Sequence, residues 1–201
     1  MTNPIEPVPG VWYHPEVVGV ELADRIKADL LRETRHAGAE ILIDGERHPT
    51  PRLVSSYADS ALRLVGMEDS RIWTEDLAEL RDAVGAEVGE TFNYALANLY
   101  RNQDDYTGWH SDKAHLHATD SAIAIVSFGD TRRLAVRSYE TPEDVVTFDM
   151  AERSVVVMNL AVQASHEHTV LKEETPRGPR LSITLRNIVI EDSYLAAPSV
   201  M

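Results

Sequence analysis

The chain of 201 residues predicts a mainly β fold with flanking helices, in which the strands form a double-stranded β-helix, or jelly roll. Two observations support this prediction. After Gly89, short apolar segments of strand length follow one another, separated by turn residues. Before Gly89, two longer segments have the apolar spacing of amphipathic helices. We expect a single domain over residues 1–201, with helices and a substrate-covering segment in residues 1–90 and the jelly-roll core in residues 91–190.

The N-terminal half contains two predicted helices. Residues 21–36 form the first, with an apolar stripe at helical spacing: Leu22, Ile26 and Leu30. Residues 74–88 form the second, with Thr74 at the N-cap and four apolar residues facing inward: Leu77, Leu80, Val84 and Val88. Between the helices, residues 44–68 contain prolines and predict an irregular or hairpin segment over the site.

Six strands are predicted in the C-terminal half, because short apolar runs alternate there with turn residues. They are residues 92–100, 122–128, 134–137, 145–148, 155–160 and 180–190. Such a succession of short strands is typical of a jelly roll with helices packed outside.

The composition favours a monomer in the cytoplasm. The chain has no cysteine, which excludes disulfides and thiolate metal sites and suits a reducing compartment. The N-terminus lacks the pattern of a signal peptide, and no segment is apolar enough to span a membrane, so no membrane partner is expected.

A metal site is indicated by the spacing of His110 and Asp112. If the two residues lie on a strand, the period of two turns both side chains to one face, where an imidazole and a carboxylate can bind one metal. A second imidazole from elsewhere would complete a two-histidine, one-carboxylate site with open positions, as in non-heme Fe(II) oxygenases. Taken alone, the pair is more typical of ordinary surface or hydrogen-bonded residues than of a metal site.

An anion site is indicated by the predicted strand that contains Arg180 and Arg186. Its apolar residues are all odd-numbered and its polar residues even-numbered, which is typical of a half-buried strand and places both arginines on one face. Either this face is exposed to solvent or it meets an anion, such as a dicarboxylate bound by the guanidinium groups. Asn98 and Tyr100, two residues apart, can offer an amide and a phenol to the same anion.

Together these motifs resemble the AlkB-like family of Fe(II)/2-oxoglutarate dioxygenases, in the branch that includes the human DNA-repair homologues. The resemblance covers residues 51–188. It is carried by PRL and SYAD in residues 51–59, TFNYALANLYRN in 91–102, GWHSD in 108–112, AIVSFGDTRR in 124–133 and RLSITLR in 180–186. The fold that it implies is the cupin-like jelly roll already predicted.

The resemblance also implies a role for each candidate residue. His110, Asp112 and His168 bind Fe(II) in the family, while the residues that hold 2-oxoglutarate are Asn98, Tyr100, Arg180 and Arg186. The spacing from His168 to the two arginines agrees with the family, so His168 is preferred to His166 as the third ligand. The roles of His115, His117 and His166 stay open.

The expected chemistry is hydroxylation of a C–H bond, with 2-oxoglutarate and dioxygen as cosubstrates and succinate and carbon dioxide as products. A dealkylation can follow from that hydroxylation. Because Asp112 keeps a carboxylate at the metal, halogenation, which related enzymes perform, is not expected.

Local departures from the family bear on the substrate. The repair enzymes have an acidic residue that recognises the flipped base where this chain has Ala114, and an aromatic pair where it has Leu64 and Gly66. A Gly-Lys pair of the DNA-probing hairpin appears as Gly45 and Glu46. The net charge of −14, from 33 acidic against 19 basic residues, also opposes binding to phosphates.

The sequence therefore favours hydroxylation of a small molecule, with oxidative dealkylation of alkylated nucleobases as the alternative. A metal-binding jelly roll without turnover is the third class. We expect little demethylation of 1-methyladenine or 3-methylcytosine, because Ala114 offers no hydrogen-bond acceptor. The tentative substrate-binding residues are Arg52, Tyr57, Lys113 and Ala114, and further cations that could meet a polar substrate are Arg47 and Arg133.

Overall fold

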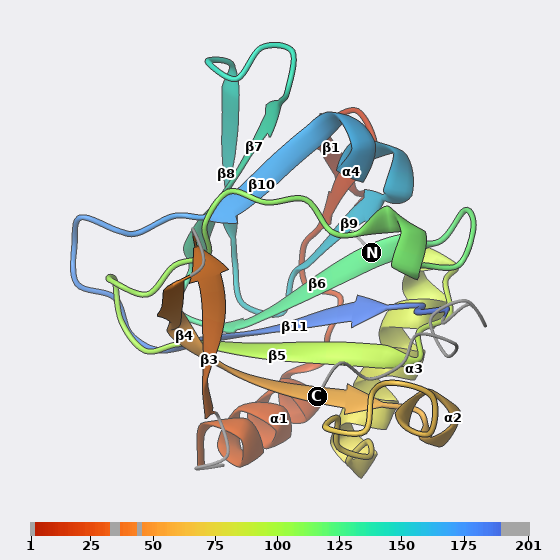
Figure 1. Ribbon diagram of the computed structural model, residues 1–201. Helices are drawn as coiled ribbons and strands as arrows, with labels where there is room; N and C mark the ends of the chain where they lie inside the picture. Colours follow the sequence, from red (N-terminus) through yellow and green to blue (C-terminus); the bar gives the residue numbers. More distant parts are fainter. Residues whose placement is uncertain (1–2, 33–36, 44–45, 190–201) are drawn as a thin grey trace.

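The computed structural model describes residues 3–32, 37–43 and 46–189, which form two antiparallel sheets with helices beside them (Figure 1). The eight-stranded sheet has the order β1-β2-β9-β6-β11-β5-β4-β3, and the three-stranded sheet has the order β10-β7-β8. This arrangement confirms the mainly β fold class with flanking helices.

The bounds of the elements follow the chain. The strands of the large sheet are β1 (Ile5–Val8), β2 (Val11–His14), β3 (Ala37–Ile43), β4 (Glu46–Ala58), β5 (Tyr94–Tyr100), β6 (Ala122–Gly129), β9 (Val155–Asn159) and β11 (Arg180–Arg186). Those of the small sheet are β7 (Arg132–Ser138), β8 (Val145–Met150) and β10 (His166–Val170). The helices are α1 (Val20–Arg32), α2 (Ser60–Arg63), α3 (Glu75–Val88), α4 (Leu160–Ser165) and the short 3-10 helix η1 (Ala114–Leu116).

Helices α1 and α3 cover one face of the large sheet, and the small sheet lies on its other side (Figure 1). The predicted N-cap of α3 is confirmed: the Thr74 hydroxyl accepts a hydrogen bond from the Leu77 amide at 3.2 Å. Gly89 ends the helix with φ +75°, a conformation that suits glycine. Within the described residues, no helix combines the length and the apolar character that a membrane span requires.

Alternation along the central strands divides the interior into two layers. The odd-numbered residues of β5 and β11 pack against the helices: Ala95, Ala97, Leu99, Leu181, Ile183 and Leu185. The even-numbered residues face the space between the sheets: Leu96, Asn98, Tyr100, Ser182, Thr184 and Arg186. The sequence left open whether the arginine-bearing face of this strand is exposed to solvent or turned inward; the small sheet covers this face and leaves Arg180 with 0% exposure, so the inward alternative holds.

The N-terminal half differs from the prediction, since it supplies four strands to the large sheet. Residues 44–68 were expected to form an irregular or hairpin segment; β4 pairs antiparallel with β3, the strand before it in the chain, and also with β5. The prolines obscured this strand because proline cannot donate a ladder hydrogen bond. Pro49 is paired with β3 only, and pairing with β5 begins at Leu53, beyond Pro51.

The six predicted strands all exist, with shifted ends, but the sequence missed β10. Its residues HEHTV lack an apolar run, so their pattern indicated no strand. The last predicted strand ends at Arg186 rather than residue 190, and α1 ends at Arg32, with residues 33–36 outside the described part.

Candidate functional site

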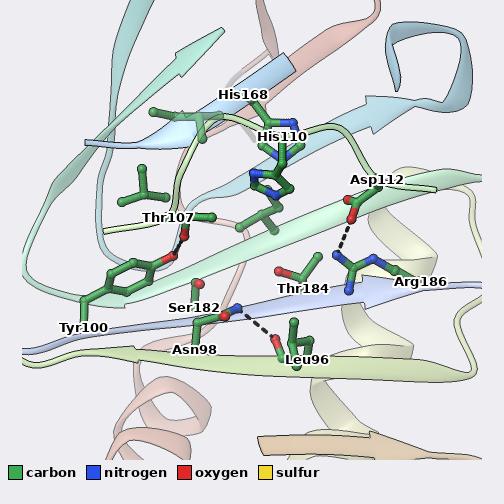
Figure 2. Close-up of a pocket in the computed structure, with 13 residues that line it drawn as sticks. Leu96, Asn98, Tyr100, Thr107, His110, Asp112, His168, Ser182, Thr184 and Arg186 are labelled. Atoms are coloured by element: carbon green, nitrogen blue, oxygen red, sulfur yellow. Dashed lines mark hydrogen bonds and ion pairs between the residues drawn. The ribbon is translucent and has the colours of Figure 1, made fainter. Parts of the chain in front are cut away.

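A cavity between the two sheets brings together most of the residues singled out from the sequence (Figure 2). Strands β5, β6 and β11 form its floor, and β7, β10 and the segment before η1 form its other walls. Its lining residues are Leu96, Asn98, Tyr100, Thr107, His110, Asp112, Ile125, Leu134, His168, Val170, Ser182, Thr184 and Arg186.

His110 and His168 lie side by side because their backbones are paired. The His110 amide donates to the His168 carbonyl at 3.1 Å and the reverse bond is 2.8 Å, so the ring centroids are 4.3 Å apart. The His110 Nδ1 lies 2.8 Å from the Gly108 carbonyl, to which it donates, leaving Nε2 free to bind a metal. Burial and the neighbouring His110 lower the pKa of His168 to about 3, which keeps the imidazole neutral, as a ligand must be.

Asp112 lines the same cavity and is held by Arg186. One carboxylate oxygen, Oδ1, accepts from the Arg186 Nη2 at 2.7 Å, while Oδ2 is buried and has no hydrogen-bond partner (Figure 2). Burial by itself raises the pKa of Asp112, but Arg186 and the two histidines outweigh it and the pKa is lowered. The carboxylate is therefore ionised at neutral pH.

The donor set suits Fe(II), although the side chains of His110, Asp112 and His168 are not arranged as a coordination sphere. Two neutral imidazoles and an ionised carboxylate with an unpartnered oxygen are the ligands of a mononuclear iron site. Within the described residues, no three His, Cys, Asp or Glu side chains are placed to hold a metal ion together. The three candidates share one cavity, and their role as metal ligands remains a prediction.

Arg180 is a buried cation for which the described residues supply no carboxylate. Its Nη2 donates to the Ser127 hydroxyl at 2.9 Å, and its guanidinium carbon lies 5.1 Å from the centroid of the Tyr100 ring. Its Nε and Nη1 are buried without a hydrogen-bond partner, and burial lowers its pKa to about 10. Because a desolvated guanidinium is costly without an anion, this group suits the carboxylate of a bound cosubstrate.

Two neutral side chains beside Arg180 are fixed by hydrogen bonds. The Tyr100 hydroxyl is bonded to the Thr107 hydroxyl at 2.8 Å. The Asn98 side-chain oxygen accepts from the Nε of Arg52 at 2.8 Å, and its amide nitrogen lies 3.4 Å from the Leu96 carbonyl. Arg52 therefore contacts a candidate cosubstrate residue, although the sequence assigned it to the substrate.

Sequence reasoning missed Arg132, which is also fully buried. Its guanidinium donates to the carbonyls of Asn102 at 3.0 Å, Asp105 at 2.7 Å and Leu171, and it lies 5.6 Å from the Tyr100 ring centroid. A signal was present in the strand pattern, since Arg132 is in phase with two buried apolar residues of β7, Leu134 and Val136.

A second pocket, of about 470 Å³, adjoins the first and shares Leu96, Asp112 and Arg186 with it. Its remaining lining residues are Met67, Tyr94, Ser111, Lys113, Leu116, His117 and Ile188. The walls are mainly apolar, and the volume lies within the range of pockets that hold small molecules.

The structure corrects the expectation for Tyr57. This residue pairs with Ala95 and lies with it in the core between the large sheet and the helices, where it is 1% exposed. Because side chains alternate along β4, Tyr57 points away from the pockets, whereas Arg52 points toward the inner layer.

The other candidates lie in different surroundings. Lys113 lines the second pocket and is exposed, whereas Ala114 begins η1 and is absent from the described lining of either pocket. Arg133 is ion-paired with Glu173 at 3.0 Å, and His166 is bonded to Ser165 at 2.8 Å, outside the lining of both pockets. Gly45 and the side chains of Glu46 and Arg47 lie outside what the structure describes.

A jelly roll with two histidines, an aspartate and a buried arginine around one cavity is the architecture of a cosubstrate-dependent iron oxygenase. The model of the 2OG-Fe(II) oxygenase superfamily matches residues 25–186, and the chain belongs to this family. The family resemblance expected from the sequence is thereby confirmed, and it identifies Fe(II) as the cofactor and 2-oxoglutarate and dioxygen as the cosubstrates.

Curated relatives and a solved structure agree with this family. The human alpha-ketoglutarate-dependent dioxygenase alkB homolog 3 is 30% identical over 188 residues, or 89% of this chain and 66% of its own length. The human DNA oxidative demethylase ALKBH2 is 30% identical over 84% of this chain and 69% of its own length. The cattle alkB homolog 3 is also 30% identical, and the chain spans 64% of its length. The structure of OsALKBH1 shares the fold, with a TM-score of 0.66, 15% identity, and coverage of 92% of this chain and 100% of that one.

Proposed function

We propose that this protein is a Fe(II)/2-oxoglutarate-dependent dioxygenase in which His110, Asp112 and His168 bind iron. Asn98, Tyr100, Arg180 and Arg186 hold 2-oxoglutarate. The observation that carries the proposal is Arg180, a fully buried cation with two unpartnered nitrogens beside the cavity that contains the paired imidazoles. Such a cation calls for an anionic ligand, and a dicarboxylate also has the oxygen atoms that iron prefers.

The substrate that we propose is an alkylated nucleobase, held in the second pocket. Two observations support this choice. Among the relatives is a DNA oxidative demethylase, which is 30% identical over 84% of this chain. The pocket of about 470 Å³ has mainly apolar walls and shares Asp112 with the candidate iron site, so it has room for a flat ring beside that site.

When bound, Fe(II) with 2-oxoglutarate and dioxygen supplies the oxidation: one oxygen atom enters the substrate C–H bond, and the other enters succinate as carbon dioxide leaves. The N–C bond of a hydroxylated N-methyl group then breaks, releasing formaldehyde and leaving the ring nitrogen of the base unalkylated. The protein contributes binding and orientation, through Arg180 for the distal carboxylate and through the apolar pocket walls for the ring.

Hydroxylation of a small molecule is the second candidate. It is favoured by the net charge of −14 and by Ala114, which cannot accept a hydrogen bond from a base. Leu64, in the position where the repair enzymes have an aromatic residue, is 84% exposed, so it does not cover a ring in the pocket. Both candidates use the same iron and cosubstrate chemistry.

Turnover assays with defined substrates test the proposal. The purified protein with Fe(II) and 2-oxoglutarate under air is given 1-methyladenine and 3-methylcytosine, as free nucleosides and in single-stranded oligonucleotides. We expect succinate and formaldehyde in equal amounts, and neither product from His110→Ala. Succinate formation that responds to small molecules and not to any alkylated base would favour the second candidate. If anaerobic titration detects binding of neither the metal nor 2-oxoglutarate, the proposal that the protein is a Fe(II)/2-oxoglutarate-dependent dioxygenase is refuted.

A further inference from the structure

The segment that carries His110 and Asp112 is held beside β10 by few backbone bonds. Residues 101–113 lie between β5 and η1, and the green trace that contains them runs beside β10 (Figure 1). Their described backbone bonds to β10 are the two between His110 and His168 and one from the Thr107 amide to the Val170 carbonyl at 3.1 Å. A segment with so few bonds opens locally unless side chains hold it in place.

Arg137, near the end of β7, lies on the face of the small sheet that points away from the cavity. Leu134 and Val136 of the same strand belong to the core between the sheets, so alternation places Arg133 and Arg137 on the outer face. In the register of the small sheet, Arg137 is opposite Glu167 of β10. Its Nε donates to the Glu167 Oε1 at 2.7 Å, and its Nη2 lies 2.6 Å from the same oxygen.

The Arg137 guanidinium also reaches past β10 to Trp109. Its carbon atom lies 4.1 Å from the centroid of the Trp109 ring, which is the distance of a cation stacked on an aromatic face. Trp109 is partly buried and is absent from the described lining of both pockets, whereas the next residue, His110, lines the first cavity. The two neighbours therefore serve opposite sides of the chain.

Trp109, Arg137 and Glu167 form one contact group, the outer-face cluster, which joins three neighbouring segments. Trp109 directly precedes His110, and Glu167 directly precedes His168. The side chains of Arg137 and Glu167 are 27% and 19% exposed, so their ion pair is better shielded than a pair on the open surface. The cluster thus holds the chain immediately beside both histidines whose rings lie 4.3 Å apart.

We propose that the outer-face cluster positions the metal ligands: Arg137 fixes the backbone at Trp109 and Glu167 and thereby sets the separation of the His110 and His168 imidazoles. This inference rests on the proposed function, in which both histidines bind iron, and adds residues that touch neither the metal nor the substrate. Groups that hold metal ligands in place commonly change the metal affinity by about 10- to 100-fold when they are removed. Ligands held in place before binding lose less freedom when the metal arrives.

Titration with Mn(II) alone, followed by the electron paramagnetic resonance of the free ion, tests the proposal without turnover. Arg137→Met should raise the dissociation constant of Mn(II) about tenfold. Arg133→Met is the matched control, because Arg133 lies on the same face of the same strand and binds Glu173 at 3.0 Å instead. Its dissociation constant should stay within about twofold of the wild type. Equal affinities of Arg137→Met and Arg133→Met would overturn the role of Arg137.

Variants of Trp109 test whether stacking on the ring carries the effect. Trp109→Ala should weaken Mn(II) binding as Arg137→Met does, whereas Trp109→Phe keeps an aromatic face and should recover most of the affinity. The double variant Arg137→Met, Trp109→Ala should bind Mn(II) within about twofold of Arg137→Met, because either change alone breaks the same contact. Losses that multiply in the double variant would show that the two residues act separately and would overturn the cluster.

Amide hydrogen exchange of the metal-free protein measures the positioning itself. The amides of His110 and His168 donate to each other's carbonyls, so their exchange reports opening of this pair. Arg137→Met should accelerate both about tenfold and leave the amides of the β5–β11 ladder unchanged, whereas Arg133→Met should accelerate neither. Unchanged exchange at His110 and His168, or equal acceleration in the ladder, would refute positioning by Arg137.

Failure of the proposed function gives a different result from failure of the outer-face cluster. If the wild-type protein binds no Mn(II), the iron site and the positioning of its ligands are both refuted. If the wild type and Arg137→Met bind Mn(II) equally well, the iron site stands and the role of the cluster alone is refuted.

Discussion

Arg132 and Arg180 lie against the same ring: their guanidinium carbons are 5.6 and 5.1 Å from the centroid of Tyr100. Arg132 is neutralised in part by Glu173 at 3.7 Å and donates to three backbone carbonyls. Within the described part of the chain, Arg180 has no such carboxylate, and two of its nitrogens are unpartnered. Two buried arginines in one cluster thus differ in their partners: among the described residues Arg132 has a carboxylate and three carbonyl acceptors, with its Nε alone lacking a hydrogen bond, whereas Arg180 is the one that we propose binds an anionic ligand.

Replacement of Arg180 by Met should raise the dissociation constant of 2-oxoglutarate about 30-fold or more, because the cosubstrate loses a desolvated charged partner. Iron binding should be retained, since Arg180 is not a metal ligand. Anaerobic titration of each ligand measures both quantities. Arg25→Met, which changes an exposed arginine on α1, is the control. An unchanged affinity for 2-oxoglutarate would remove Arg180 from this role.

Replacement of His110, Asp112 or His168 by Ala should abolish iron binding and turnover, because each change removes one of the three proposed ligands. His166→Ala should retain most of both, since His166 lies outside the lining of the cavity. Metal content after anaerobic loading gives the comparison. If His168→Ala retains iron and His166→Ala loses it, then His166 rather than His168 is the ligand.

The stability of the metal-free protein should fall as the pH is lowered from about 6.5 toward 3, in part because of His168. Its pKa is lowered to about 3 in the folded chain, so between these pH values the unfolded state binds a proton that the folded state excludes. The slope from this residue is at most about 1.4 kcal/mol per pH unit. Urea unfolding across this range, compared with His168→Asn, measures it; identical slopes in the two proteins would contradict the assignment.

Arg132→Met should destabilise the fold by about 2 to 4 kcal/mol, because it leaves buried carbonyls without donors. Arg133→Met provides a matched control, since its partly exposed side chain binds the same Glu173 and should cost less than about 1 kcal/mol. Denaturant unfolding measures both changes. If the free energy of unfolding falls equally in the two variants, the buried hydrogen bonds of Arg132 contribute nothing to stability beyond its ion pair with Glu173.

Some features of this protein follow from local sequence patterns. Residues 74–88 predicted α3 and its Thr74 cap, because apolar spacing and capping are properties of a short segment. Alternation likewise placed Arg180 and Arg186 on one face of β11, because the period of two is built into every strand. The spacing of His110, Asp112 and the following motifs indicated the family, which the comparisons confirm.

Tertiary structure decided what those faces meet. The small sheet covers the polar face of β11 and buries Arg180 fully, and no pattern within the strand could decide between a covered and an exposed face. Pairing with β5, distant in sequence, helps to make β4 a strand. The same pairing places the Tyr57 side chain in the core between the large sheet and the helices. Among the described residues, the fold also leaves the buried His117 Nε2 without a hydrogen-bond partner. Local residues determine which side chains share a face, whereas burial and partnership depend on segments distant in sequence, which only the folded chain brings together.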